Sequence, residues 1–264
     1  MPATLATSTE EDLKDLIALD VNIGGKGTKF FFRKNSLGDN LAIKQVFQDV
    51  CYRIDHWPQG RALHKFHQEI GGDRPALIID AGANIGTSAI FFLNIFEGAF
   101  VFAIEPEEFN SQLLELNTTS YGQIFNFQGA VASKDGTLCV TDPGKTDMGF
   151  RTWEVRPGDD GRPNRRQQVP SLSPASILKH PAVAGMAPLI FKIDIEGAED
   201  DLFSGDTSWM RQFPLIIIEL HDWMLPFSGS SKNFLKALAN YEFDVVYSGE
   251  NLFLFNREIL ENYV

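Results

Sequence analysis

Residues 76–92, ALIIDAGANIGTSAIFF, constrain the fold most, because they join an apolar strand to an apolar helix through a glycine-bearing turn. The four apolar residues before Asp80 are typical of a buried parallel strand. Gly82 and Gly86 allow a sharp turn and let a ligand approach the amides at the start of the helix. A second apolar strand ends at Glu105, 25 positions after Asp80, close to the roughly 20-residue offset at which a nucleotide-binding βαβ unit places a carboxylate on ribose hydroxyls. The stretch therefore predicts a site for a ligand with a ribose.

The glycine spacing indicates which kind of ligand this is. A dinucleotide fingerprint GxGxxG that includes Gly82 would need glycine at Asp80 and Ile85, and the register ending at Gly86 meets alanine at both other positions. An NAD site is therefore disfavoured. An acid at the strand end suits a ligand that carries an ammonium and a sulfonium, and it would repel a pyrophosphate. The pattern DxGxxxG resembles the first motif of the S-adenosylmethionine-dependent methyltransferases.

From residue 72 onward, apolar strands alternate with helices, which predicts an α/β fold with a doubly wound, mostly parallel sheet. Residues 243–247 and 252–255 predict a closing antiparallel hairpin. The alternation lapses at residues 137–170, where segments 137–141 and 149–155 alternate like a hairpin. We interpret residues 137–170 as an insertion above the carboxyl edge of the sheet, where substrate-selecting loops are common.

The first 71 residues carry no recognisable chemistry, and we predict that they form an N-terminal helical cap ahead of a domain at residues 72–264. Helices are expected at residues 10–19, 39–51 and 61–70, with Asp39 as the N-cap of the second. A short strand is expected at residues 29–33.

Charge and composition limit the partners. The formal net charge of −12 disfavours nucleic acid, since proteins that bind it usually present a basic patch. Two cysteines, Cys51 and Cys139, make neither a disulfide framework nor a zinc site by themselves. No secretory signal or long apolar run is present, so we expect a cytoplasmic protein without a membrane partner. A homo-oligomer remains open.

Several segments together resemble one family, the FkbM-type methyltransferases. These are FKIDIEGAE at residues 191–199, IIELH at 217–221, DAGANIG at 80–86 and IEP at 104–106, within a resemblance that covers about residues 30–255. The resemblance implies a class I, Rossmann-like methyltransferase fold, S-adenosyl-L-methionine as cofactor, and O-methylation of a hydroxyl on a sugar, polyketide or other small natural product. The irregular insertion departs from the pattern, so the identity of the acceptor is not implied.

The expected cofactor residues follow the strand ends. Glu105 is assigned to the ribose diol, and the small, turn-prone residues 129–136 lie where an adenine can rest against the backbone. The full set that we expect to bind the cofactor is Asp80, Gly82, Ala83, Asn84, Gly86, Glu105, Pro106, Ala130 and Asp194.

Methyl transfer to a hydroxyl needs a proton acceptor near the strand ends. Asp194 and Glu219 end two consecutive strands, and His221 follows two residues later. His221 is the first choice as base, because its unperturbed pKa near 6.5 suits neutral pH. Asp194 is the second choice, or it holds the ammonium of the cofactor. We expect no metal, although the same three residues could alternatively bind a divalent ion.

Neighbouring charged residues also have structural explanations. Lys192 is costly in a buried strand unless Asp194 or Glu219 neutralises it. Glu196 and Glu199 fall in the first turn of a helix expected from residue 195 to about residue 210, where the helix dipole favours acids.

Two rival functions remain at this stage. One is an NAD-linked Rossmann oxidoreductase, and the other is a non-catalytic interaction module that keeps the methyltransferase fold. Calorimetry with S-adenosylmethionine and NADH distinguishes them, because a module need bind neither.

Overall fold

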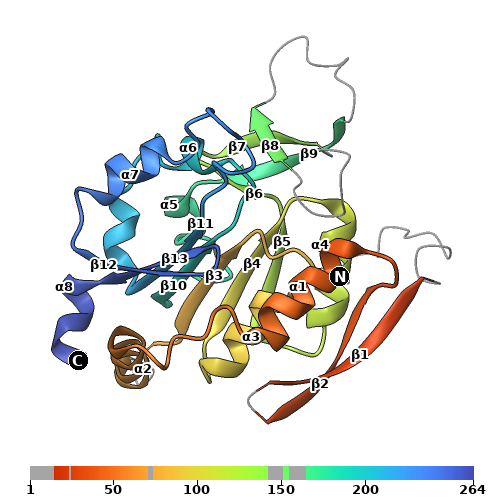
Figure 1. The fold of residues 1–264 in the computed structure, drawn as a ribbon, viewed down its shortest axis with the longest axis horizontal. Helices are drawn as coiled ribbons and strands as arrows, with labels where there is room; N and C mark the ends of the chain where they lie inside the picture. Colours follow the sequence, from red (N-terminus) through yellow and green to blue (C-terminus); the bar gives the residue numbers. More distant parts are fainter. Residues whose placement is uncertain (1–14, 24, 71–73, 142–150, 155–164) are drawn as a thin grey trace.

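The computed structural model describes residues 15–23, 25–70, 74–141, 151–154 and 165–264. Its centre is a seven-stranded sheet with the order β12-β13-β11-β10-β3-β4-β5 (Figure 1). The five strands from β11 to β5 are parallel, and β13 runs antiparallel to both β11 and β12. The strands are β3 (Ala76–Ala81), β4 (Phe100–Glu105), β5 (Ile124–Gln128), β10 (Ala187–Ile193), β11 (Leu215–Glu219), β12 (Phe243–Ser248) and β13 (Asn251–Asn256).

The strand order reverses between β3 and β10. The chain runs outward from β3 to β4 and β5, and it then returns to place β10 and β11 on the other side of β3. In open α/β sheets, ligands bind outside the carboxyl ends of the strands at this reversal. The fold therefore places the glycine-bearing turn after β3 beside the carboxyl end of β10.

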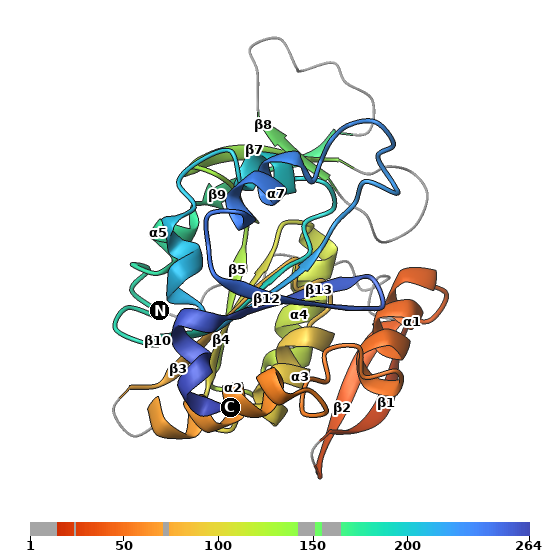
Figure 2. The ribbon, with the colours of Figure 1, turned by 60° about the vertical axis from the view of Figure 1, so that its left-hand side comes forward.

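Both faces of the sheet are covered, which explains the continuous apolar run in β3, a strand buried along its whole length. Ile78 joins a core shared with α2 (Pro58–Ile70), α3 (Thr87–Ile95) and α4 (Glu108–Thr118). Its neighbours Leu77 and Ile79 join a second core with α5 (Pro174–Ile177), α6 (Glu199–Leu202) and α7 (Lys232–Leu238). The two groups of helices lie on opposite sides of the sheet (Figures 1 and 2).

The first described element corrects the expected helix at residues 10–19. Leu16–Ile23 is a strand, β1, paired antiparallel with β2 (Lys26–Arg33), and residues 10–14 lie outside the described part. Val21 and Ile23 are buried, as are Phe30 and Phe32 on the partner strand. This period-two pattern and a glycine turn favour a hairpin over a helix.

The expected helix at residues 39–51 is two elements. Helix α1 (Leu37–Ile43) continues as a π-helix, η1 (Lys44–Gln48), and the N-cap is Ser36, whose side chain accepts from the amide of Asp39. Asp39 itself is fully buried and pairs with Arg33. Helix α2 contains the helix expected at residues 61–70 and begins at Pro58, a residue favoured in the first helical turn.

The predicted insertion contains strands of a separate, four-stranded sheet with the order β6-β9-β7-β8. Its strands are β6 (Ala130–Val131), β7 (Gly136–Thr141), β8 (Arg151–Glu154) and β9 (Arg165–Leu172). The pairing of β7 with β8 matches the expected hairpin, whereas β9 was not predicted. Residues 142–150 and 155–164 lie outside the described part. Gln167 of β9 donates to the carbonyl of Pro106, so this sheet adjoins the carboxyl end of β4.

The helix expected from residue 195 to about residue 210 is also interrupted. Glu196 and Gly197 have φ values of 57° and 99°, which no α-helix accommodates. The segment forms the short helix α6 and a 3₁₀ turn, η3 (Ser208–Gln212). Within the described residues, no helix is long and apolar enough to cross a membrane.

Candidate functional site

A cavity with about 870 Å³ of empty space, part of it open to solvent, lies at the reversal between β3 and β10. One wall is formed by the turn after β3, by Glu105 and Pro106, and by Ala130 of β6. Asp194 and Glu196 close the side toward β10. The N-terminal region forms part of the opposite wall through Ala42, Gln45, Val46 and Tyr52.

The turn after β3 has left-handed backbone at Gly82, Asn84 and Gly86, with φ values of 78°, 50° and 96°. A Cβ atom at Gly82 would lie 1.8 Å from the carbonyl oxygen of Asp194. Glycine is therefore required there for close approach as well as for its φ angle. Gly82, Ala83 and Asn84 line the cavity, whereas Gly86 lies behind it at the start of α3.

Glu105 at the end of β4 lines the cavity, as its predicted role requires. Its Oε2 accepts from the amide of Asn84 at 2.9 Å, and its Oε1 accepts from the amide of Glu107 at 2.9 Å. Burial raises the pKa of Glu105 to about 7, although the two amide hydrogen bonds oppose this shift. Each carboxylate oxygen keeps a lone pair that can accept a hydrogen bond from a hydroxyl group of a ligand.

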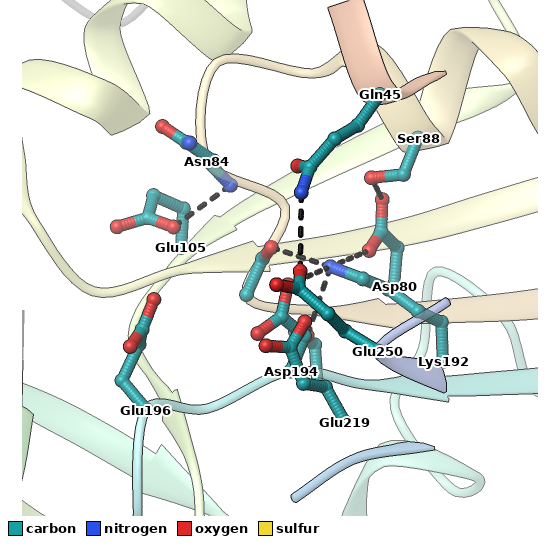
Figure 3. Close-up of polar contacts among 12 residues, drawn as sticks. Gln45, Asp80, Asn84, Ser88, Glu105, Lys192, Asp194, Glu196, Glu219 and Glu250 are labelled. Carbon is teal, nitrogen blue, oxygen red and sulfur yellow. Dashed lines mark hydrogen bonds and ion pairs between the residues drawn. The ribbon is translucent and has the colours of Figure 1, made fainter. Parts of the chain in front are cut away.

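Asp80 does not face the cavity, unlike most of the other expected cofactor residues. Its carboxylate is fully buried, with Lys192 Nζ 3.1 Å from Oδ1 and the Ser88 hydroxyl donating to Oδ2 at 2.6 Å (Figure 3). The Lys192 ammonium also donates to the carbonyl of Gly82 at 2.7 Å and lies 3.4 Å from Asp194. Lys192 thus pairs with the expected Asp194 and, at a shorter distance, with Asp80, which was not predicted as its partner. Asp80 therefore influences the cavity indirectly, because it holds Lys192, which lines the cavity and donates to the carbonyl of Gly82 in the turn.

Acidic side chains and one histidine gather at the adjoining ends of β10 and β11, as their parallel pairing requires. His221 Nδ1 lies 2.8 Å from Glu199 Oε1. Its Nε2 lies 3.6 Å from Asp194 Oδ1, 3.6 Å from Glu196 Oε2 and 3.7 Å from Glu219 Oε1. One ligand atom each from Asp194, Glu219 and His221 lies within 4.8 Å of the others, an arrangement that could hold a metal ion.

The negative charge of this cluster changes how its members ionise. Burial and the nearby charge of Asp194 raise the pKa of Glu219 to about 8 and that of Glu196 to about 7. Burial would lower the pKa of His221, but the hydrogen bond and charge of Glu199, together with Asp194 and Glu196, outweigh it and raise this pKa to about 9. The site therefore favours cationic ligands or bound protons.

Exposure separates the three predicted catalytic residues. The side chain of Asp194 is 26% exposed, that of Glu219 is 15% exposed and that of His221 is only 2% exposed. Of the three, only Asp194 lines the cavity. His221 and Glu219 do not line the cavity, and they lie next to each other, with His221 Nε2 3.7 Å from Glu219 Oε1.

Sequence reasoning missed three residues of the site. Glu199 was explained by the helix dipole, yet its side chain is fully buried and holds His221. Gln45 donates to Glu250 at 3.1 Å across the site, and Tyr52 lines the cavity after a turn in the N-terminal region. No local pattern announces these roles, because each depends on residues far away in the chain.

Comparisons with known proteins give one family. The sequence profile described as "Methyltransferase FkbM domain" matches residues 80–262, more than half of the chain. No curated protein sequence matches the chain. Among solved structures, methyltransferase FkbM from Methylobacillus flagellatus KT is 16% identical, with a TM-score of 0.44, and the alignment covers 83% of this chain and 60% of that one. The chain thus spans well under two thirds of that protein.

Two further solved structures are similarly distant. The fibrillarin pre-rRNA processing protein of Methanococcus jannaschii is 12% identical over 95% of this chain and 85% of its own, with a TM-score of 0.42. The precorrin-6y C5,15-methyltransferase of Geobacter metallireducens GS-15 is 9% identical over 73% and 84%, with a TM-score of 0.35. The family assignment follows from the domain match.

Proposed function

Because this chain belongs to the FkbM methyltransferase family, we propose that it is an S-adenosyl-L-methionine-dependent O-methyltransferase acting on a hydroxyl of a sugar, polyketide or other small natural product. The observation that carries the proposal is the cavity at the strand-order reversal. It is bounded by Glu105 at the end of β4 and by Asp194 at the end of β10, and β3 lies between these two strands. The left-handed turn at residues 82–84 lies between these two carboxylates.

The residues of the cavity fit the parts of this cofactor. Glu105 presents two carboxylate oxygens that can accept from the two ribose hydroxyls. Asp194 is partly exposed on the other side, where its carboxylate would hold the ammonium of the methionine portion only if it were not the residue that contacts the acceptor. Ala130 and Pro106 provide small, apolar contacts suited to an adenine ring. When bound, the cofactor supplies an electrophilic methyl group on a sulfonium.

The chain then has two tasks, which are to position the acceptor oxygen and to take its proton. Positioning contributes strongly to a displacement of this kind, because both reacting atoms must be aligned. His221 was the first choice as base, but its ring is 2% exposed and lies behind the cavity wall. We therefore assign direct contact with the acceptor to Asp194, the second choice, and place Glu219 and His221 behind it.

The rival functions fit the site less well. The family match favours methyl transfer over an NAD-linked oxidoreductase. An open, acidic cavity at the strand-order reversal favours an enzyme over a module that only keeps the fold.

Two measurements test the proposal. Calorimetry on the full chain should show one site for S-adenosylmethionine and for S-adenosylhomocysteine, and no binding of NADH. Incubation with S-[methyl-¹⁴C]adenosylmethionine and a host extract should label a small hydroxylated compound, identified by mass spectrometry as a methyl ether. Binding of NADH, or labelling only of nitrogen or carbon, would contradict the proposal.

A further inference from the structure

We propose that Asp194, Glu219 and His221 bind one divalent metal ion of the Mg²⁺ or Mn²⁺ kind beside the cofactor cavity. The ion would select acceptors that offer two oxygen atoms on neighbouring carbons, such as vicinal diols, catechols or 2-hydroxy acids. The part of this inference that concerns acceptors rests on the proposed function, whereas the metal site itself does not.

The spacing of the ligand atoms suits one ion. His221 Nε2 is 3.6 Å from Asp194 Oδ1 and 3.7 Å from Glu219 Oε1, and the three ligand atoms all lie within 4.8 Å of one another. Ligands about 2.1 Å from one ion are separated by about 3.0 Å at right angles and by about 4.2 Å when opposite. The two separations from His221 Nε2 fall between these limits, and they are too long for direct hydrogen bonds.

The imidazole of His221 is held in an orientation that suits metal binding. Its side chain is 2% exposed, and Nδ1 donates to Glu199 Oε1 at 2.8 Å. In the neutral ring, a proton held at Nδ1 leaves a lone pair on Nε2, which is directed at the oxygens of Asp194, Glu196 and Glu219, and an ion that binds there displaces the second proton of the charged ring. A buried carboxylate that fixes a histidine in this way is the usual support of a metal-bound histidine. Glu199 Oε1 also accepts from the amide of Gly197 at 3.2 Å, which fixes the carboxylate that holds the ring.

Neighbouring groups leave the position available. The ammonium of Lys192 is bound by Asp80 at 3.1 Å and by the carbonyl of Gly82 at 2.7 Å, and it meets Asp194 only at Oδ2, at 3.4 Å. Asp194 directs Oδ2 toward Lys192 and Oδ1 toward His221, so its two oxygens serve different partners. The carboxylate of Glu196 supplies a further oxygen at the rim. Figure 3 shows the carboxylates of Asp194 and Glu219 close together, with Glu196 to one side.

The donor set indicates the kind of ion. Two carboxylates suit the hard ions Mg²⁺ and Mn²⁺, and one imidazole shifts the preference toward Mn²⁺. Three protein ligands leave open positions on an octahedral ion. Two of these can take a pair of acceptor oxygens, and Asp194, which also lines the cavity, places that pair next to the methyl donor.

Titration of the metal-free full chain with MnCl₂, followed by electron paramagnetic resonance and calorimetry, tests the site. We expect one bound Mn²⁺ per chain, with affinity at least tenfold weaker in Glu219→Gln and Asp194→Asn. The matched control is Glu250→Gln, which removes a nearby negative charge without removing a ligand, and its affinity should stay within threefold of the unmodified chain. Thermal unfolding verifies that each variant is folded.

The positioning role of Glu199 has its own readout. Glu199→Gln should weaken Mn²⁺ binding about 10- to 100-fold. Pulsed electron paramagnetic resonance of the bound Mn²⁺ should show a coupling to a ¹⁴N nucleus, and this coupling should disappear in His221→Gln. Absence of the nitrogen coupling in the unmodified chain, or equal loss of affinity in Glu250→Gln and Glu219→Gln, would overturn the proposed site.

The acceptor class is tested with catechol and phenol as probes. Catechol should change the resonance spectrum of the Mn²⁺-loaded chain, and phenol should not, because only catechol can replace two water ligands at once. Equal effects of both probes would overturn the acceptor class. Calorimetry with S-adenosylmethionine is run on the same samples. Loss of metal binding with intact cofactor binding contradicts only the metal site, and the reverse result contradicts the proposed function.

Discussion

At the scale of single residues, the buried pair of Asp80 and Lys192 connects the core to the site. Its two members face each other in the register of β3 and β10, a match that neither strand reveals by itself. This is why the sequence could predict that Lys192 needs a carboxylate but selected Asp194 or Glu219. The glycines of the turn and Glu105 were predicted because their signal lies in local spacing.

Replacing Lys192 by Met should destabilise the fold by about 3–5 kcal/mol, because it leaves the fully buried Asp80 carboxylate without a cation. The control is Lys44→Met, which breaks an ion pair whose lysine is 60% exposed and should cost less than about 1 kcal/mol. Urea unfolding without ligand measures both. Equal costs would show that the buried pair contributes no more than a surface pair.

Replacing Glu105 by Ala should weaken the binding of S-adenosylmethionine by roughly 1.5–3 kcal/mol, since it removes charged acceptors for the ribose hydroxyls. Calorimetry would then show roughly a 10- to 150-fold increase in Kd. Glu108→Ala, an exposed neighbour on α4, is the control and should leave the Kd unchanged. An unchanged Kd in Glu105→Ala would contradict the ribose assignment.

The raised pKa of Glu105, about 7, also predicts a pH dependence of cofactor binding. Only the ionised carboxylate can accept from both ribose hydroxyls, so affinity should rise with pH up to about 7 and level off above it. Below pH 7 the loss should approach tenfold per pH unit, as expected for one required deprotonation. Calorimetry between pH 5.5 and 8.5 measures this, with Glu105→Gln expected to be nearly independent of pH. Affinity that increases as the pH falls would refute the role.

At the scale of elements, the strands of the central sheet were easier to predict than the pieces around it. Apolar runs such as the one in β3 are typical of buried parallel strands. In β1 and β2 only alternate residues are buried, and the strands form because they pair with each other. The interrupted helix after β10 follows from the left-handed backbone of Glu196 and Gly197, which residue type alone does not announce at a glutamate. The unpredicted β9 pairs with residues far away in the chain.

The turn between β3 and α3 provides a matched pair of glycine variants. Gly82→Ala adds a Cβ atom that would lie 1.8 Å from the Asp194 carbonyl oxygen, whereas Gly98→Ala, at nearly the same φ of 79°, meets nothing within 4 Å. Gly98→Ala should cost about 1–2 kcal/mol of backbone strain and leave cofactor binding intact. Gly82→Ala should cost more and abolish cofactor binding, as measured by urea unfolding and calorimetry. Equal behaviour of the two variants would show that contact between β3 and β10 is not required.

At the scale of the whole molecule, the N-terminal region and the sheet share one core. Phe30 and Val46 belong to the same buried cluster as Phe91 and Phe92 of α3. The boundary between a cap at residues 1–71 and a domain at residues 72–264 therefore stays a prediction. Sequence patterning could identify the region as distinct, but it could not show which apolar side chains the region covers.

Deletion of residues 1–71 should prevent stable folding, because it uncovers the apolar face of α3 and removes one wall of the cavity. Size-exclusion chromatography and circular dichroism should show an aggregated or unfolded product. A monodisperse, helical product that binds S-adenosylmethionine with unchanged Kd would establish residues 72–264 as an independent domain.

The strand order has a consequence for synthesis in the cell. Lys192 and Gly82 touch across the crevice although they are 110 positions apart, and the intervening chain forms an outer part of the sheet. A ribosome must therefore release β10 before the nascent chain can close the side of the cavity that Lys192 and Asp194 form. Until then the unfinished protein has only the part of the cavity that precedes β10, and it cannot gain the full stability that the bound cofactor would give.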